Sequence, residues 1–440
     1  MIYPDFTTLH HWLNQFEETA RLMTEEGAPQ ACAAPMEQLI NFLQKSCQQM
    51  AKVPQNPLLA KREPDDLDTI QQLCSEGPRT LWQDAPSDEV MTDKLMGALY
   101  GRVIGCLMGV PVECWSYQQI ARWAQVTGQL FPPTDYFERV ENPHLQNAYG
   151  WERSAYTREA MQTAPVDDDI IYTQLGLLIL EKYGLNFTTE DVAEMWLEKL
   201  PLACTAEEAV LNSLKRGIPA LDAVGIENPF YQWIGAAIRS DAFGYAAAGH
   251  PRKAAEMAWQ DARLTHRRNG IYGEMLLAAA QSAAFAVDDP LEAIRIGMTE
   301  IPKESRLYQD LTWALEQEVK DYQEAVELVW THFGADMSYV HTNNNLCLIV
   351  FGFKIGGTDP VKVLSQLVAM GMDNDCTAAS AGSIIGAIVG WKNIPPYLYE
   401  RFHNTMETYL KDTKPFQFDD MARRFLKLQH QLKESTQNQA

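Results

Sequence analysis

The stretch GMDNDCTAASAGSIIGAIVG, Gly371–Gly390, decides the fold of this chain. Small residues recur in it every four positions, at Ala378, Gly382, Gly386 and Gly390. An earlier stretch, GALYGRVIGCLMGVPVE at 97–113, repeats glycine at the same interval. This interval puts the small residues on one face of a helix. Glycine inside a helix costs about 1 kcal/mol relative to alanine, so we expect each smooth face to pack closely against another helix.

The rest of the chain also has helical periodicity. Between about 91 and 410, apolar residues recur at three- and four-residue spacing, as in EDVAEMWLEKL at 190–200, and alternating β-type runs are few. We therefore predict an all-α helical bundle at 91–412. Residues 1–90 read as amphipathic helical pieces and are predicted to form an N-terminal helical extension. Residues 413–440 are predicted to form a C-terminal helix and a disordered tail, ESTQNQA.

Composition excludes several classes of protein. Of the 440 residues, 46% are hydrophobic and 21% charged, which is enough apolar content to bury a core. The net charge of −22 would repel nucleic acid and anionic membranes over most of the surface. We therefore expect neither as a partner, although a bound cation or a local arginine cluster could still hold a small anionic substrate.

Other features predict a cytoplasmic protein. The eight cysteines include no C-x-x-C pair, which favours reduced thiols over disulfides or a zinc site. The N-terminal residues have neither the basic nor the apolar region of a signal peptide. The apolar stretches at 95–112 and 378–391 are shorter than the roughly 20 residues of a membrane span, and Arg102 interrupts the first.

Two acidic segments precede apolar helices. Asp167, Asp168 and Asp169 lie directly before IIYTQLGLLILEKYG, and Asp373 and Asp375 precede the second glycine-rich helix. Each segment alone could simply cap its helix, because carboxylates accept hydrogen bonds from free N–H groups there. Two such segments in one helical core favour a shared hard cation, since clustered carboxylate oxygens suit Mg²⁺.

Polar residues elsewhere are candidates for substrate binding. Arg239, His266 and Asn269 offer a cationic and hydrogen-bonding group that could hold a phosphate or a ribose, or could be a solvated helix end. Asn344 lies in the polar run HTNNN at 341–345, where asparagines could equally cap a helix. Walker A, dinucleotide-binding and H-E-x-x-H motifs are absent, so a kinase, a dehydrogenase or a zincin is not supported.

In order, these segments resemble the ADP-ribosylglycohydrolase family from about Asp93 to Lys392. GALYGRVIGCLMGVPVE is similar to the family's glycine-rich first helix with its P-x-E, PVDDDIIYT to its T-D-D-T metal motif, and GMDNDCTAASAGSIIGAIVG to its long C-terminal signature. The resemblance implies an all-α fold with an acidic metal site between these motifs. It makes 91–412 an ADP-ribosylglycohydrolase-like catalytic domain.

The resemblance implies roles for the acidic residues. Asp167, Asp168, Asp169, Asp373 and Asp375 would hold one or two Mg²⁺ ions, and Cys376, in place of a hydroxyl ligand, weighs against the second ion. Glu113 would act as general base or acid, with Asp168 as the other catalytic residue, and Arg239, His266, Asn269 and Asn344 would bind substrate.

We therefore predict a Mg²⁺-dependent glycosidase-type hydrolase that cleaves an N- or O-glycosidic bond to ADP-ribose or a related ribosyl group, on a protein-linked or small-molecule substrate. Two alternatives remain open. The substrate could be a small nucleoside-like or N-ribosyl metabolite, or the protein could be an inactive ADP-ribose-binding module, which the retained carboxylates argue against.

Overall fold

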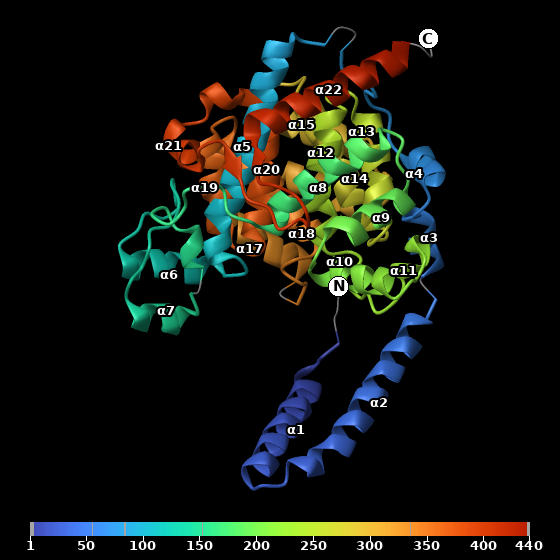
Figure 1. The fold of residues 1–440 in the computed structure, drawn as a ribbon, viewed down its shortest axis with the longest axis vertical. Coiled ribbons are helices and arrows are strands. Elements are labelled where there is room, and N and C mark those ends of the chain that lie inside the picture. Colours follow the sequence, from blue (N-terminus) through green and yellow to red (C-terminus); the bar gives the residue numbers. More distant parts are fainter. Residues whose placement is uncertain (1–3, 55, 83–84, 152, 335, 438–440) are drawn as a thin grey trace. The chain divides into compact units, whose positions relative to one another are not determined.

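The protein is built almost entirely of α-helices, as predicted. The computed structural model describes residues 4–54, 56–82, 85–151, 153–334 and 336–437. Within these residues it contains 22 α-helices, several short 3-10 turns and one antiparallel pair of two-residue strands (Figure 1). The all-α fold class is therefore confirmed.

The chain divides into two compact units, residues 1–61 and 62–440. The first unit contains α1 (Thr7–Glu25) and α2 (Ala33–Ala51), and α3 (Pro57–Arg62) crosses the boundary. The first unit is thus shorter than the extension predicted at 1–90. Residues 62–90 belong to the second unit, in which Glu63 and Ile70 are buried.

The second unit holds the remaining elements. These are α4 (Leu67–Leu73), α5 (Asp88–Gly109), α6 (Tyr117–Thr127), α7 (Pro143–Tyr149), α8 (Asp168–Tyr183), α9 (Thr189–Lys199), α10 (Thr205–Lys215), α11 (Ala220–Ala223), α12 (Asp241–Ala246), α13 (Pro251–Ala262), α14 (Asn269–Ala284), α15 (Pro290–Met298), α16 (Arg306–Glu316), α17 (Tyr322–Phe333), α18 (Thr342–Gly356), α19 (Pro360–Met370), α20 (Asn374–Val389), α21 (Pro396–Tyr399), β1 (Thr405–Met406), β2 (Phe416–Gln417) and α22 (Phe418–Gln437).

The core of the second unit is built around helices that are covered on every side. Figure 1 shows α5 and α20 side by side, and this pair makes the most extensive helix–helix contact. All residues of α14 are buried between α12, α13 and α15. Helices that are apolar all round need such complete cover. The span Asp88–Val112 is long and apolar enough to cross a membrane, but its apolar window lies wholly inside the protein.

Helix ends follow local signals in the sequence. Thr188 and Asp191 form a capping box at the start of α9. At the other end of the chain, α22 continues to Gln437, so residues 434–437 extend the helix where a disordered tail was predicted. Residues 438–440 of that predicted tail lie outside the described residues.

Candidate functional site

The central helix pair brings the two acidic motifs together. A Cβ atom added to Gly101 would overlap the carbonyl oxygen of Gly382, and one added to Gly109 would overlap the backbone of Asp375. Residue numbers therefore fall along α20 as they rise along α5, so the two helices are antiparallel. The C-terminal end of α5 thus meets the N-terminal end of α20, where the second acidic segment lies.

We expect Gly101→Ala to destabilise the protein. The new methyl group must displace the backbone of α20 at Gly382, and overpacking of this kind costs about 1–3 kcal/mol. Gly225→Ala is the matched control, because its Cβ would have only the Asp222 carbonyl oxygen nearby, at 3.9 Å. The measurement is the urea midpoint of unfolding for both variants. Equal midpoints would contradict the close packing of the two helices.

A paired loop places Glu113 beside the start of α20. The 3-10 turn Val110–Val112 ends α5. The following backbone then pairs with the segment before α20: Cys114 N donates to Met372 O at 2.9 Å, and Met372 N donates to Trp115 O at 3.2 Å. These bonds fix the distance between Glu113 and the second acidic motif.

The Glu113 cluster consists of Glu113, Asp373 and Asp375. One carboxylate oxygen from each residue lies within 4.8 Å of those of the other two. Asp373 and Asp375 are buried, whereas the Glu113 side chain is 27% exposed. Asp375 Oδ1 is buried and has no hydrogen-bond partner. A buried carboxylate oxygen without a donor is costly unless a ligand satisfies it.

The Asp168 cluster consists of Asp167, Asp168 and Asp169 at the N-terminus of α8. Their carboxylate oxygens also lie within 4.8 Å of one another. Asp167 is the N-cap of α8, and its side chain accepts a hydrogen bond from Asp169 N at 3.0 Å. Asp167 therefore caps the helix, as the sequence allowed. Asp168 does not take part in this cap.

Electrostatics join the two clusters. Burial, followed by the charge of neighbouring carboxylates, raises the pKa of Asp167, Asp373 and Asp375 well above the usual range. Burial and then the charge of Glu113 raise the pKa of Asp168. Arg102 joins the Asp168 cluster to α20, because it donates to Asp169 Oδ1 at 2.8 Å and to Ser380 Oγ at 3.0 Å. Mutual repulsion of buried carboxylates favours binding of a cation or of protons. Their hard oxygens, with Asp375 Oδ1 unsatisfied, fit a divalent ion such as Mg²⁺.

Arg102, in the middle of α5, holds one face of the Asp168 cluster. It is buried, and it donates to Asp169 O at 2.7 Å and to Asp169 Oδ1 at 2.8 Å. It also pairs with Asp241 at 3.2 Å. Burial raises the pKa of Asp169 to about 7, against the opposing effect of Arg102. Asp169 Oδ1 therefore already accepts a hydrogen bond from Arg102, although Asp169 was predicted to bind the metal. In the sequence, Arg102 was noticeable only as a single charged residue in an apolar helix.

Arg153 is a second cation at the site that the sequence did not indicate. Its guanidinium lies 2.7 Å from Glu113 Oε2, and both side chains are partly exposed. Burial lowers the pKa of Arg153, but the charges of Glu113, Asp375 and Asp167 outweigh this effect and raise it. Arg153 therefore holds Glu113 at the edge of the Glu113 cluster.

Cys376, the residue that departs from the family motif, faces the interior. It is buried, and burial together with the charges of Asp169 and Asp373 raises the pKa of its thiol well above the usual range. A protonated thiol is a poor ligand for a hard cation. The neighbouring Asn374 is also buried and donates to Val368 O at 2.9 Å.

Arg239, predicted to bind substrate, lies in a buried charge cluster. It is 2% exposed and pairs with Glu207 at 2.5 Å, with Asp261, and with Glu274 at 3.4 Å. Burial raises the pKa of all three carboxyl groups, that of Glu207 to about 7, although Arg239 opposes the effect. We call these four residues the Arg239 cluster. The Arg239 guanidinium pairs with these buried carboxyl groups, so it does not face a ligand-binding surface.

His266 and Asn269, also predicted to bind substrate, are buried near the same region. His266 Nδ1 is 2.7 Å from Thr265 Oγ1, and burial lowers the pKa of His266 well below its usual range. Asn269 donates to Gln232 Oε1 at 2.9 Å and accepts from Leu307 N at 3.0 Å. Both side chains hold loops and helix ends together, whereas the sequence had suggested substrate binding or a solvated helix end.

Asn344 lies closer to the acidic site. Its amide donates to Ser338 O at 2.9 Å, and it lines a cavity of about 230 Å³ together with Cys114, Tyr339 and Met372. Cys114 and Met372 are the neighbours of Glu113 and Asp373 in the chain, so this cavity borders the Glu113 cluster. It is the part of the described structure where a small substrate could approach Glu113.

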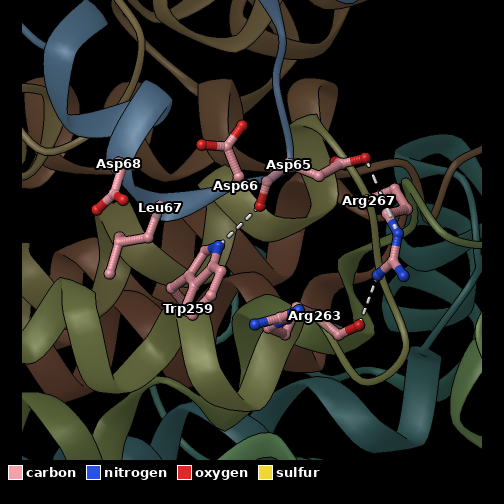
Figure 2. Close-up of a pocket in the computed structure, with 7 residues that line it drawn as sticks. All are labelled: Asp65, Asp66, Leu67, Asp68, Trp259, Arg263 and Arg267. Carbon is pink, nitrogen blue, oxygen red and sulfur yellow. Dashed lines mark hydrogen bonds and ion pairs between the residues drawn. The ribbon is translucent and has the colours of Figure 1, made fainter. Parts of the chain in front are cut away.

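A larger cavity, of about 490 Å³, involves neither acidic cluster (Figure 2). There the segment before α4 lies on α13: Trp259 Nε1 donates to Asp65 O at 2.8 Å, and Arg267 lies 3.9 Å from Asp65 Oδ2. The Arg263 guanidinium stacks 4.2 Å from the Trp259 ring. Arg267 also donates to Arg263 O at 2.5 Å, and Asp66 accepts from Thr69 N at 2.9 Å, so these side chains serve to hold the segment before α4 against α13.

The chain is similar to one protein family and to a solved structure. The family model described as ADP-ribosylglycohydrolase matches residues 87–435. A solved structure titled "ADP-ribosylglycohydrolase-related protein complex" is 18% identical, covers 78% of this chain and 99% of its own, and has a TM-score of 0.47. No curated protein matches the chain.

Proposed function

This chain belongs to the ADP-ribosylglycohydrolase family of glycosidase-type hydrolases, and we propose that it cleaves, with the help of a divalent cation, a glycosidic bond to an ADP-ribosyl or related ribosyl group. The observation that carries the proposal is the convergence of Glu113, Asp373 and Asp375 from the ends of two separate helices. Family membership supports activity on ADP-ribose-type substrates, and the donor set supports Mg²⁺.

The residues divide the chemistry among them. Asp373, Asp375 and Asp168 would hold the cation, which when bound would polarise the hydroxyl groups of the ribose. Glu113, partly exposed at the edge of the site, would take a proton from water. The resulting nucleophile adds to the anomeric carbon as the glycosidic bond breaks, and the leaving group departs with the electron pair of that bond and takes up the proton that Glu113 received. The remaining carboxylates stabilise the positive charge that develops on the ribose.

Arg153 would keep Glu113 in place for this step. Its ion pair with Glu113 Oε2 fixes one oxygen of the carboxylate. The guanidinium is also 44% exposed, so it can contact an anionic substrate without breaking that pair.

A small N-ribosyl metabolite is the second candidate substrate. The cavity beside Glu113 measures about 230 Å³, whereas pockets for drug-sized ligands commonly measure about 300–1,000 Å³. This size favours a compact substrate, or recognition of only the ribose end of a larger one.

A hydrolysis screen tests the proposed function. The full chain is incubated with ADP-ribosyl-arginine, ADP-ribosyl-serine, O-acetyl-ADP-ribose and simple ribosides, each with Mg²⁺, with Mn²⁺ and with a chelator. The proposal expects turnover of at least one substrate that the chelator abolishes. Tight binding of ADP-ribose without any turnover would instead indicate an inactive binding module.

Divalent-cation binding has its own readout, which needs no substrate. At a concentration 100 times its dissociation constant, a ligand stabilises the folded state by about 2.7 kcal/mol. We expect Mg²⁺ or Mn²⁺ to raise the unfolding temperature, and Asp375→Asn to remove most of that increase, because Asp375 supplies an unsatisfied buried oxygen. Glu318→Gln, at an exposed position, is the control and should keep the full increase.

A reducing compartment such as the cytoplasm remains our proposal for the location. All eight cysteines are free, and burial raises the pKa of Cys106 and Cys347 well above the usual thiol range. Thiols of this kind are slow to oxidise.

A further inference from the structure

The first unit leaves an unusual amount of apolar surface uncovered. Among the described residues, nineteen large hydrophobic side chains are exposed, and ten of them lie within the 61 residues of this unit. They are Phe6, Leu9, Trp12, Leu22, Met36, Ile40, Phe42, Met50, Val53 and Leu58. The other nine are spread over the 379 residues of the second unit. Scattered single side chains need no partner, but such a concentration does.

Neither α1 nor α2 has a fully buried residue, so the two helices do not cover each other's apolar side chains. The partly covered positions include Leu13 and Phe16 in α1, and Leu39 and Leu43 in α2, at the three- and four-residue spacing of one helix face. Trp12 and Phe42 remain 66% and 67% exposed. Two helices alone cannot enclose their apolar side chains, so those of this unit lack a cover.

We propose that the first unit pairs with the same unit of a second copy of this chain and forms a four-helix bundle. The exposed area fits such a dimer. Eight side chains between Phe6 and Met50 are each 44–67% exposed, which leaves on the order of 800 Å² of apolar surface, given that one aromatic side chain can bury about 150–250 Å². A standard interface takes about 800 Å² from each partner.

Charge also favours this pairing. Residues 1–61 contain six acidic and four basic residues, a net charge of −2, so −20 of the total of −22 lies in residues 62–440. Two copies repel each other strongly through their second units, and least through the first. A strongly basic or acidic partner would find no complementary charge on this nearly neutral surface.

The test is the mass of the full chain in solution. Sedimentation equilibrium from 1 to 100 µM should give twice 49.7 kDa. Trp12→Lys combined with Phe42→Lys should weaken dimerisation on the order of 100-fold, as loss of two central aromatic anchors does. The control, Leu130→Lys with Leu202→Lys, changes two exposed side chains of the second unit equally and should leave the dimer intact.

A second measurement separates loss of pairing from loss of folding. If the lysine variant loses helix by circular dichroism, Trp12→Ala with Phe42→Ala replaces it, because alanine favours helix. Hydrogen exchange in residues 7–51 should also slow as the protein concentration rises. A chain that is monomeric at every concentration, or a dimer that the paired variants leave unchanged, would overturn the proposal.

Discussion

Glu113→Gln is expected to lower turnover on the order of 10²- to 10⁴-fold, the usual contribution of a general base. Glutamine keeps the size of the side chain and removes its basicity. Glu113 is held by Arg153 and lies within 4.8 Å of the ligand oxygens of Asp373 and Asp375, so its carboxylate is fixed where water and ribose would meet. Since the side chain is partly exposed, the free energy of unfolding should change by only about 0.5 kcal/mol or less.

The measurement is the turnover number on whichever substrate the hydrolysis screen identifies, at saturating Mg²⁺. Glu318→Gln serves as the control for loss of one carboxylate elsewhere. The increase in unfolding temperature with Mg²⁺ is recorded for both variants. If Glu113→Gln loses this increase as well as turnover, Glu113 is a metal ligand. Unchanged turnover would move the catalytic role to one of the aspartates.

The position of Glu113 could be predicted because the signals that set it are local. Glycine every four residues produces a smooth helix face whatever surrounds it, and two such faces pack together. In the structure Gly101 contacts Gly382 and Gly109 contacts Asp375. The ends of the two helices therefore had to meet. The meeting of the second acidic motif with Glu113 follows from that packing together with the backbone hydrogen bonds between Cys114, Trp115 and Met372.

The roles of the buried polar residues could not be predicted in the same way. The sequence around Arg239 and His266 does not distinguish a substrate pocket from a buried charge cluster. The residues that contact them, which decide between the two, come from distant parts of the chain. Glu207 is on α10 and Glu274 on α14. Arg153 gave no signal, because it lies in a loop whose position near Glu113 depends on the tertiary fold.

The boundary of the first unit was also set by long-range contacts. Glu63 is 2% exposed and pairs with Arg268 and Arg306, while Arg306 N donates to its Oε1 at 2.9 Å. These partners lie more than 200 residues away. Residues 62–66 were therefore predicted to belong to the N-terminal extension, although Glu63 fastens them to the rest of the second unit.

Arg239→Met is expected to cost about 3–5 kcal/mol of folding stability, the range for breaking a buried ion pair from one side. Methionine fills similar space to arginine, so the loss of folding stability comes from removing the positive charge. Without the guanidinium, Glu207, Asp261 and Glu274 remain buried with no cation. Their pKa values are already raised by burial, and loss of Arg239 raises them further.

The direction of the pH dependence follows from these raised pKa values. A carboxyl group whose pKa is higher in the folded than in the unfolded protein contributes stability below the unfolded value, and this is lost as pH rises through the folded value. For Glu207 the window runs from its ordinary value near 4.5 to about 7 in the folded protein. Arg239→Met raises the folded-state pKa of Glu207 further, so the pH window extends upward. The variant should therefore be less stable than the native protein by a larger free energy of unfolding at pH 8 than at pH 5.

Two comparisons separate this structural role from substrate binding. Arg216→Met removes an arginine that is 53% exposed and 3.7 Å from Glu227, and such a surface pair contributes about 1 kcal/mol or less. Combining Arg239→Met with Glu207→Gln should recover part of the lost stability, because one of the stranded carboxylates is then neutral. A substrate-binding arginine would behave differently: its loss would weaken substrate binding while the urea midpoint of unfolding stayed near that of the native protein. The buried carboxylates around Arg239 argue for the first result, since each must otherwise remain charged in an apolar interior or take up a proton.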